Sequence, residues 1–477
     1  MIDHLAPWRG ILPDQRLAAI ERLAGSAPPY TIRLNTLRID RQTALREWSG
    51  WQVEPAPLCP DALRLPDRPA GLGRSLEHRM GFFYIQDLAS MLPGELFSPF
   101  GAEPLILDLA AAPGGKTTHL ACKSADRGLI VANDVSGGRS GATLANLRRW
   151  GTTSAAVTAL PGERFGKWFP ETFDAALLDA PCSGDNLRNP VERGRGGGSK
   201  GRRVSARERR ALHERQLRLL MSAFSAVRPG GEIVYSTCTV APVENEAVLD
   251  EFLGRVGNAA EIVRPDRLAD LPGGLPTING QDFDPQVASA IRLWPDDFDT
   301  GAFFAALIRK RESLRDTMTE PDAASARRGA FEPLPAAERS RIAGALHAGY
   351  GFELDKLLGE TWLELWHAGR LIHALPRALN EVFAALPVKA AGMLLGELDE
   401  GGFTPSHELV SRFFERFPEG RLHIPAEQVA DWLAGRDLAG LDAPANRIVL
   451  AEDDRGRFLG RGRALAERVK PMLPAGF

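Results

Sequence analysis

The chain has 477 residues, 44% of them hydrophobic and 25% charged, and a formal net charge of −3. This composition is ordinary for a soluble globular protein of several domains and excludes a globally basic nucleic-acid binder, so any contact with nucleic acid must be local. Four cysteines in this length exclude a disulfide framework, and their spacing excludes a zinc finger. No apolar run reaches the roughly 18 residues that cross a membrane, and the N-terminus lacks a signal-peptide core, so we expect a cytoplasmic protein.

The first 75 residues are predicted to form a small unit of their own. Apolar residues have helical spacing at 17–23 and at 41–48, and residues 30–35 suit a strand between them. Five prolines between positions 55 and 69 then mark the exit from this unit.

A mononucleotide-binding start is predicted near residue 110. A buried strand at 105–109 runs into a glycine turn and then a helix from about residue 119. The amino end of such a helix favours a negative group, and glycines let a ligand approach the backbone. The next predicted strand, 129–134, ends in Asp134, and an acid at that place commonly binds ribose hydroxyls.

Two other nucleotide-binding motifs resemble the sequence of this turn, but neither matches it. A phosphate-binding P-loop requires glycine where Ala110 stands, and the dinucleotide fingerprint G-x-G-x-x-G is absent. A smaller adenosyl ligand remains as the prediction, with a purely structural glycine turn as the open alternative.

Residues 188–218 carry eleven lysines and arginines and three glutamates, which gives a local charge of +8. Five glycines lie among them, and a flexible basic loop can follow a phosphate backbone. A solvated loop without a partner is an equally open interpretation. A helix is predicted from about residue 205 to residue 227.

Two more apolar runs, 173–178 and 232–235, are predicted to be buried strands, and each is followed by a cysteine. Cys182 lies in the sequence DAPCSG and Cys238 in STCT. Ligands of a doubly wound sheet bind outside the carboxyl ends of its strands, so both thiols are expected to face one crevice. A lone cysteine is more often a packing residue, and Cys59 and Cys122 are assigned no function.

The motifs APGGKT (112–117), DAPCSG (179–184) and STCT (236–239), with ENE at 244–246, resemble the Sun/Nop/Rsm family of RNA cytosine-5 methyltransferases. RLNTL at 33–37 and the pair Gln86-Asp87 resemble N-terminal signatures of the same family. The resemblance covers at least residues 30–310 and is specific, because two motif cysteines on separate strands distinguish this family from other adenosylmethionine enzymes. WLAGRD at 432–437 and LGRG at 459–462 resemble the tail of the RsmF-like branch, which acts on small-subunit ribosomal RNA.

The resemblance implies an α/β fold, a class I S-adenosylmethionine-dependent methyltransferase with a Rossmann-like, mostly parallel sheet. It implies a small N-terminal α+β domain that contacts RNA (1–75), the catalytic domain with its basic insertion near 188–210 (76–315), and an α+β extension with a PUA-like, RNA-binding end (316–477). The implied partner is RNA, ribosomal RNA or a ribosomal subunit, with tRNA as the second substrate candidate. A monomer without membrane contact is expected.

Carbon 5 of cytosine is a poor nucleophile, and a thiolate added to carbon 6 turns the ring into an enamine. By resemblance, Cys238 is that nucleophile, Cys182 acts in product release, Asp179 binds ring nitrogen 3, and Lys116 assists. The target base must leave its stack to reach them. No metal is expected. The implied cofactor-binding residues are Ala110, Ala111, Ala112, Pro113, Gly114, Gly115, Lys116, Asp134, Arg139 and Asp179.

Two departures from the family pattern stand out. Pro161 replaces an expected acid near the adenine edge, so either Glu163 substitutes or the backbone alone holds the ring. Asp185 and Asn186 stand where the family has Glu-Gly. Two other protein classes are alternatives. The intact cysteine pair disfavours an RNA-binding assembly factor without turnover, and Ala110 disfavours a P-loop NTPase.

Overall fold

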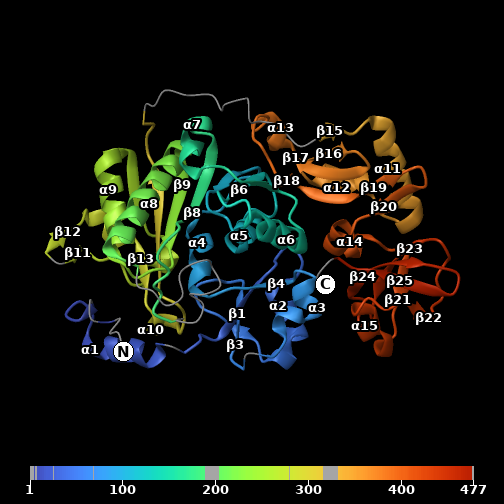
Figure 1. The fold of residues 1–477 in the computed structure, drawn as a ribbon, viewed down its shortest axis with the longest axis horizontal. Coiled ribbons are helices and arrows are strands. Elements are labelled where there is room, and N and C mark those ends of the chain that lie inside the picture. Colours follow the sequence, from blue (N-terminus) through green and yellow to red (C-terminus); the bar gives the residue numbers. More distant parts are fainter. Residues whose placement is uncertain are drawn as a thin grey trace.

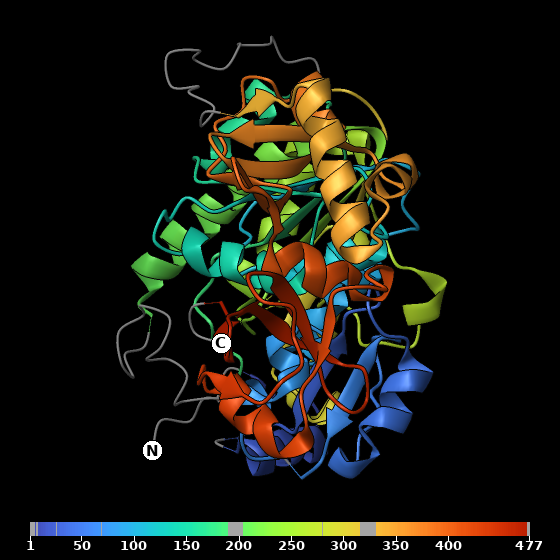
Figure 2. The same cartoon turned by 90° about the vertical axis from the view of Figure 1, so that its right-hand side faces the viewer.

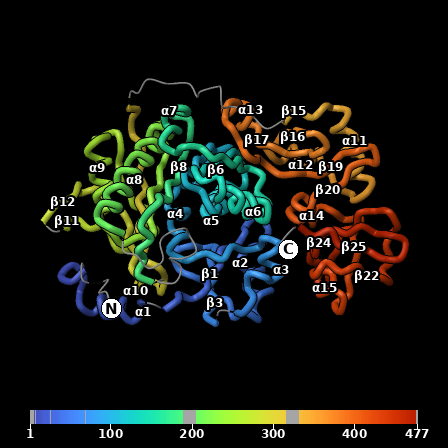
Figure 3. Tube along the Cα trace, viewed as in Figure 1, coloured from blue at the N-terminus to red at the C-terminus, as the bar shows by residue number. Residues whose placement is uncertain are grey.

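The computed structural model describes residues 5, 8–24, 26–67, 69–188, 204–278, 280–314 and 331–474. Its largest element is a nine-stranded sheet with helices on both faces (Figure 1). A four-stranded sheet formed by N-terminal residues lies beside it, and two five-stranded sheets come from the C-terminal third. The tube in Figure 3 runs from the N-terminal sheet through the large sheet to the two C-terminal sheets.

The N-terminal sheet is built from the first 85 residues. Its elements are α1 (Asp14–Leu23), β1 (Tyr30–Leu34), α2 (Arg41–Glu47), β2 (Glu54–Pro55), β3 (Ala62–Leu65), α3 (Leu76–Arg79) and β4 (Phe83–Ile85). The strands are antiparallel in the order β2-β3-β1-β4, and the predicted helices and strand are present. The sheet extends past residue 75, where the sequence predicts the end of the first unit, because β4 pairs with β1 through Ile85 and Ile32.

The large sheet contains the strands predicted at 105–109, 129–134, 173–178 and 232–235. Its strands are β5 (Leu105–Asp108), β6 (Leu129–Asn133), β7 (Ala155–Thr158), β8 (Phe173–Asp179), β9 (Val227–Thr237), β10 (Ala260–Val263), β13 (Ile291–Leu293), β14 (Phe303–Lys310) and β18 (Ala390–Ala391). The order is β10-β14-β9-β8-β5-β6-β7-β18, with β13 paired to β14. The run from β9 to β7 is parallel and the strands beyond it are antiparallel. The predicted α/β fold is therefore confirmed.

Helices on both faces explain why these strands are continuous apolar runs. Successive strand residues face opposite sides, so Ile106 packs with the α4 and α5 side and Leu107 with the α7, α8 and α9 side. The helices are α4 (Leu92–Leu96), α5 (Gly115–Lys123), α6 (Ser140–Trp150), α7 (Phe165–Trp168), α8 (Ala206–Ala226), α9 (Glu246–Val256) and α10 (Pro295–Phe298). In the part of the chain described, no helix is long and apolar enough to span a membrane.

Helix α8 begins where the sequence predicts it. Ser205 accepts the Glu208 N–H through its hydroxyl, and the Glu208 carboxylate accepts the Ser205 N–H, a capping box that satisfies both donors. Residues 189–203, the core of the predicted basic loop, lie outside the described residues. Arg188, at the start of that segment, is buried and forms an ion pair with Asp299 at 2.7 Å. Its positive charge is therefore neutralised within the fold.

The C-terminal third forms two sheets, seen face-on in Figure 2. The first contains β15 (Glu332–Pro333), β16 (Leu363–Ala368), β17 (Leu371–Pro376), β19 (Met393–Asp399) and β20 (Gly402–Pro405), with helices α11 (Ala336–Tyr350), α12 (Leu354–Glu360), α13 (Arg377–Glu381) and α14 (His407–Phe413). The second contains β21 (Arg421–His423), β22 (Leu438–Ala439), β23 (Ile448–Glu452), β24 (Phe458–Ala464) and β25 (Arg468–Met472), with α15 (Ala426–Leu433).

This C-terminal part is packed onto the rest of the chain. Strand β18 extends the large sheet by pairing Ala390 with Val157, and the Phe383 ring lies 5.1 Å from that of Phe169. Arg457 pairs with Glu77 of the N-terminal part at 2.7 Å. These contacts attach the extension to the large sheet and to the small N-terminal sheet.

Candidate active site

The two motif thiols meet at the carboxyl edge of the large sheet. Cys182 follows β8 and Cys238 follows β9, and these neighbouring parallel strands are paired up to Asp179 and Ser236. Their sulfur atoms are 3.3 Å apart, and the Cys238 side chain is exposed to solvent. The predicted convergence of both thiols on one crevice is confirmed.

A lysine–carboxylate pair lies beside the thiols. Lys116 Nζ, in the first turn of α5, is 2.7 Å from Asp179 Oδ2, and Ser236 donates to Asp179 Oδ1 at 2.8 Å. Burial lowers the pKa of Lys116, but the Asp179 carboxylate outweighs burial and raises it above its ordinary value. The structure thus holds a protonated lysine and an oriented carboxylate at the end of β8.

The two thiols have opposite acidities. A hydrogen bond from the Cys182 thiol is the main cause that lowers the pKa of Cys238, and Lys116 adds to it; burial and Asp179 oppose both. The same hydrogen bond, with burial, raises the pKa of Cys182 well above the ordinary value. The thiolate is the nucleophilic form, and with Cys182 as the hydrogen-bond donor Cys238 is the thiol that ionises more readily.

The turn predicted to bind the adenosyl group lies between β5 and α5. Gly114 has φ of 100°, a conformation that favours glycine, and a Cβ there would come within 3.3 Å of Thr143. Ala110 to Pro113 complete the turn, and the Ala111 N–H donates to Asn133 O at 2.7 Å.

Two carboxylates near this turn fit an adenosyl group. Asp134 is buried at the end of β6, accepts the Ser136 N–H at 2.9 Å and is ion-paired with Arg139. Asp108 is buried, its Oδ1 has no hydrogen-bond partner among the described residues, and burial raises the pKa of Asp108 to about 7. The acid after β6 and the amino end of α5 are features that suit an adenosyl ligand.

Pro161 directly precedes the short helix Gly162–Arg164, which carries Glu163. The Glu163 side chain turns towards α8, where its Oε1 lies 3.9 Å from Arg215 Nε.

Three residues that hold the two thiol-bearing loops in place are not among the predicted site residues. Glu244, on the turn Pro242–Glu244, accepts the Ser183 N–H at 2.8 Å, while Asn245 accepts from Thr237 at 2.5 Å. Arg209 of α8 donates to Glu244 at 3.0 Å. The ENE motif was the available signal for the first two; nothing in the sequence pointed to Arg209 beyond its charge.

The remaining cysteines lie away from this site. Cys59 is buried with Glu95 and His119, whose Nε2 is 2.9 Å from the Glu95 carboxylate. Lys123 Nζ lies 3.0 Å from the same carboxylate, so the cluster is electrically balanced by the protein alone. Cys122 lies on α5.

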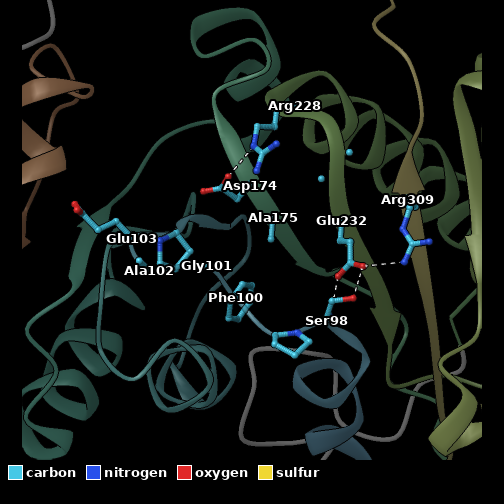
Figure 4. A pocket seen from close by; sticks show the side chains of 14 residues that line it. Ser98, Phe100, Gly101, Ala102, Glu103, Asp174, Ala175, Arg228, Glu232 and Arg309 are labelled. Carbon is cyan, nitrogen blue, oxygen red and sulfur yellow. Dashed lines mark hydrogen bonds and ion pairs between the residues drawn. The ribbon is translucent and has the colours of Figure 1, made fainter.

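The cavity shown in Figure 4 is also not the thiol site. It measures about 420 Å³ and opens by the amino end of β8, at the opposite edge of the sheet. Asp174 there is paired with Arg228 at 2.7 Å, and Glu232 with Arg309 at 3.3 Å. Two of its three carboxylates are therefore paired with arginines, and the third belongs to Glu103.

A central parallel sheet between helices, with a glycine turn after β5 and an acid after β6, defines a class I S-adenosylmethionine-dependent methyltransferase. Residues 98–309 match the family model of 16S rRNA methyltransferase RsmB/F. The ribosomal RNA small subunit methyltransferase F of Aeromonas salmonicida is 32% identical over 99% of this chain and 96% of its own length. That of Shewanella oneidensis is 33% identical over 96% of this chain and 93% of its own. The chain therefore belongs to the RsmB/F methyltransferase family.

Solved structures agree with this assignment. A methyltransferase homologue from Pyrococcus horikoshii has a TM-score of 0.52 and 29% identity, and covers 61% of this chain and 88% of its own. NSun6 from the same organism has a TM-score of 0.51 at 22% identity over 63% of this chain and 95% of its own, which shows the shared fold. The predicted family, fold, enzyme class and cofactor are confirmed.

Asp134→Ala is expected to weaken S-adenosylmethionine binding roughly 10- to 100-fold, because a charge-assisted hydrogen bond to the ribose would be lost. Isothermal titration calorimetry measures this affinity directly. Glu103→Ala, at the opposite edge of the sheet, is the matched control and should bind normally. Unchanged affinity in Asp134→Ala would remove Asp134 from the cofactor site.

Proposed function

We propose that this methyltransferase modifies carbon 5 of a cytosine in small-subunit ribosomal RNA through a covalent bond between Cys238 and carbon 6 of the base. The observation that carries the proposal is the thiol pair: two sulfurs 3.3 Å apart, with the pKa of one lowered and of the other raised. An RNA-binding factor without turnover would need no such pair, and Ala110 disfavours a P-loop NTPase.

The attack step uses Cys238, Asp179 and Lys116. The Cys238 thiolate adds to carbon 6, and the electrons of the carbon 5–carbon 6 double bond become available at carbon 5. Asp179 shares a proton with ring nitrogen 3, which takes up the negative charge that the thiolate brings into the ring, and the neighbouring Lys116 supplies a positive charge beside it. When bound, S-adenosylmethionine supplies the methyl group that carbon 5 acquires.

The release step uses Cys182. In the adduct Cys238 is a neutral thioether and no longer a thiolate that holds the Cys182 proton. Cys182 gives that proton to solvent and takes the proton from carbon 5. The electron pair of that carbon–hydrogen bond restores the ring double bond, the carbon 6–sulfur bond breaks, and Cys238 leaves as a thiolate.

The substrate assignment rests on the relatives, which are named ribosomal RNA small subunit methyltransferases. We propose that residues 1–75, the basic segment near 188–210 and the extension 316–477 contact the RNA, and that the enzyme acts as a monomer. The target cytosine must be unpaired or flipped out of its stack to reach the exposed thiol. Transfer RNA is the second candidate substrate.

Incubation with S-adenosylmethionine and either small-subunit ribosomal RNA or tRNA, followed by nucleoside mass spectrometry, tests the proposal. We expect 5-methylcytidine in the ribosomal RNA. A methyl group on another atom would overturn the chemistry, and methylation of tRNA alone would overturn the substrate.

Lys116→Met is expected to move the ionisation of Cys238 to higher pH. The thiolate is the reactive form, and the lysine charge helps to lower the pKa of Cys238, so its loss must raise that pKa. The rate of Cys238 alkylation by iodoacetamide as a function of pH, followed by peptide mass spectrometry, measures the shift. Lys123→Met, whose lysine pairs with Glu95, should leave the profile unchanged. A midpoint in Lys116→Met that stays or falls would contradict this role.

A further inference from the structure

The loop that carries Cys182 is held by a buried carboxylate. Glu244 is 0% exposed, and its Oε2 accepts the Ser183 N–H, directly after Cys182, at 2.8 Å. Its Oε1 accepts from Arg209 Nη1 at 3.0 Å. Because the amide of Ser183 is the donor, Glu244 fixes the backbone of the loop and not merely a side chain.

Helix α8 supplies the other half of this support. Arg209 also lies 3.3 Å from the Ser183 hydroxyl, and Gln216, about two turns further on, donates to Pro181 O at 2.9 Å. Gln216 also reaches Glu244 Oε2 at 3.3 Å. The residues on both sides of Cys182 are thus tied to α8.

The Cys238 loop has a different support. Asn245 accepts from the Thr237 hydroxyl at 2.5 Å and donates to Thr239 O at 2.9 Å, so it grips the residues on both sides of Cys238. Arg209 makes none of the hydrogen bonds found for Thr237 or Thr239 in the described part of the chain. Two side-chain contacts join the loops: the two sulfurs lie 3.3 Å apart, and the Ser183 and Thr239 hydroxyls lie 2.9 Å apart.

From these separate supports we infer that Glu244 and Arg209 are positioning residues for Cys182, which set the rate of product release and not that of attack by Cys238. The inference rests on the proposed covalent function. Proton removal from carbon 5 requires the Cys182 sulfur within hydrogen-bond reach of that proton, and a loop freed from α8 loses this alignment. The Cys238 loop is held by Asn245, so the Cys238 sulfur keeps its alignment with carbon 6.

Arg209→Ala is the variant of choice, because its side chain is 24% exposed and its loss leaves the Ser183–Glu244 bond in place to support folding. We expect single-turnover methylation to stay within about twofold of wild type, whereas steady-state turnover falls. A severalfold larger fraction of protein should migrate as a covalent RNA adduct on a denaturing gel. Arg209→Lys, which keeps the charge, should restore part of the turnover.

Glu251→Ala is the matched control, since Glu251 of α9 also binds α8, through His213 at 2.7 Å, without touching either thiol loop. It should release product normally. Glu244→Gln, which keeps an acceptor for the Ser183 N–H but loses the ion pair, should resemble Arg209→Ala.

Equal losses of single-turnover methylation and steady-state turnover, with no gain of adduct, would show that Arg209 supports the whole site and would overturn the inference. Cys182→Ala separates this failure from that of the proposed function. Adduct in Cys182→Ala but not in Arg209→Ala refutes only the positioning role, whereas no adduct in either variant refutes the covalent mechanism and the inference with it.

Discussion

Cys238→Ala is expected to lower methyl transfer roughly 10⁴-fold or more, a loss typical of removing a covalent nucleophile. Without this sulfur no bond to carbon 6 forms, and RNA binding stays reversible. Cys182→Ala is expected to fail differently: attack and methylation proceed, but the carbon 5 proton is not removed and the enzyme stays joined to RNA. Methyl incorporation and a denaturing gel after incubation with S-adenosylmethionine measure both effects.

The double variant Cys182→Ala/Cys238→Ala should form no adduct. Cys122→Ala is the matched control, because Cys122 lies on α5 away from the thiol pair. An adduct in Cys238→Ala and none in Cys182→Ala would exchange the two roles. Normal turnover in both single variants would exclude covalent catalysis.

Glu246→Ala is expected to destabilise the fold by about 3–5 kcal/mol, the cost of leaving a buried charge without its partner. Arg292 is 1% exposed, and its guanidinium binds both oxygens of Glu246, at 2.8 and 2.5 Å. The guanidinium also lies between the rings of Trp8, Trp294 and Phe304, which offer no countercharge. Urea unfolding measures the free energy of unfolding.

Glu251 is 44% exposed, and Glu251→Ala removes its contacts with Arg255 and His213, which should cost about 1 kcal/mol. Equal small losses in Glu246→Ala and Glu251→Ala would show that the Arg292 pair does not stabilise the fold.

The convergence of the thiols could be predicted because it depends on local pattern and one general rule. Cys182 and Cys238 each follow a buried apolar run, and the carboxyl ends of parallel neighbours share one edge of the sheet. The glycine turn and Asp134 follow from the same strand–turn–helix pattern.

Contacts between distant segments could not be predicted in this way. In the sequence, Arg209 is one of many basic residues between positions 188 and 218. Only the packing of α8 beside the thiol loops turns it towards Glu244. Glu163 points to Arg215 for the same reason. Likewise, β4 joins the N-terminal sheet and β18 joins the large sheet through long-range pairing. Such pairing cannot be predicted from the sequence of a short strand alone.

The most direct test of the covalent mechanism is the position of the bond in the adduct that Cys182→Ala accumulates. Digestion of the adduct with protease and nuclease, followed by tandem mass spectrometry, identifies the linked residue and the linked base. The mechanism predicts a peptide containing Cys238 joined to a methylated cytidine. A link at any other residue, a link to a base other than cytosine, or no linked peptide at all would contradict it.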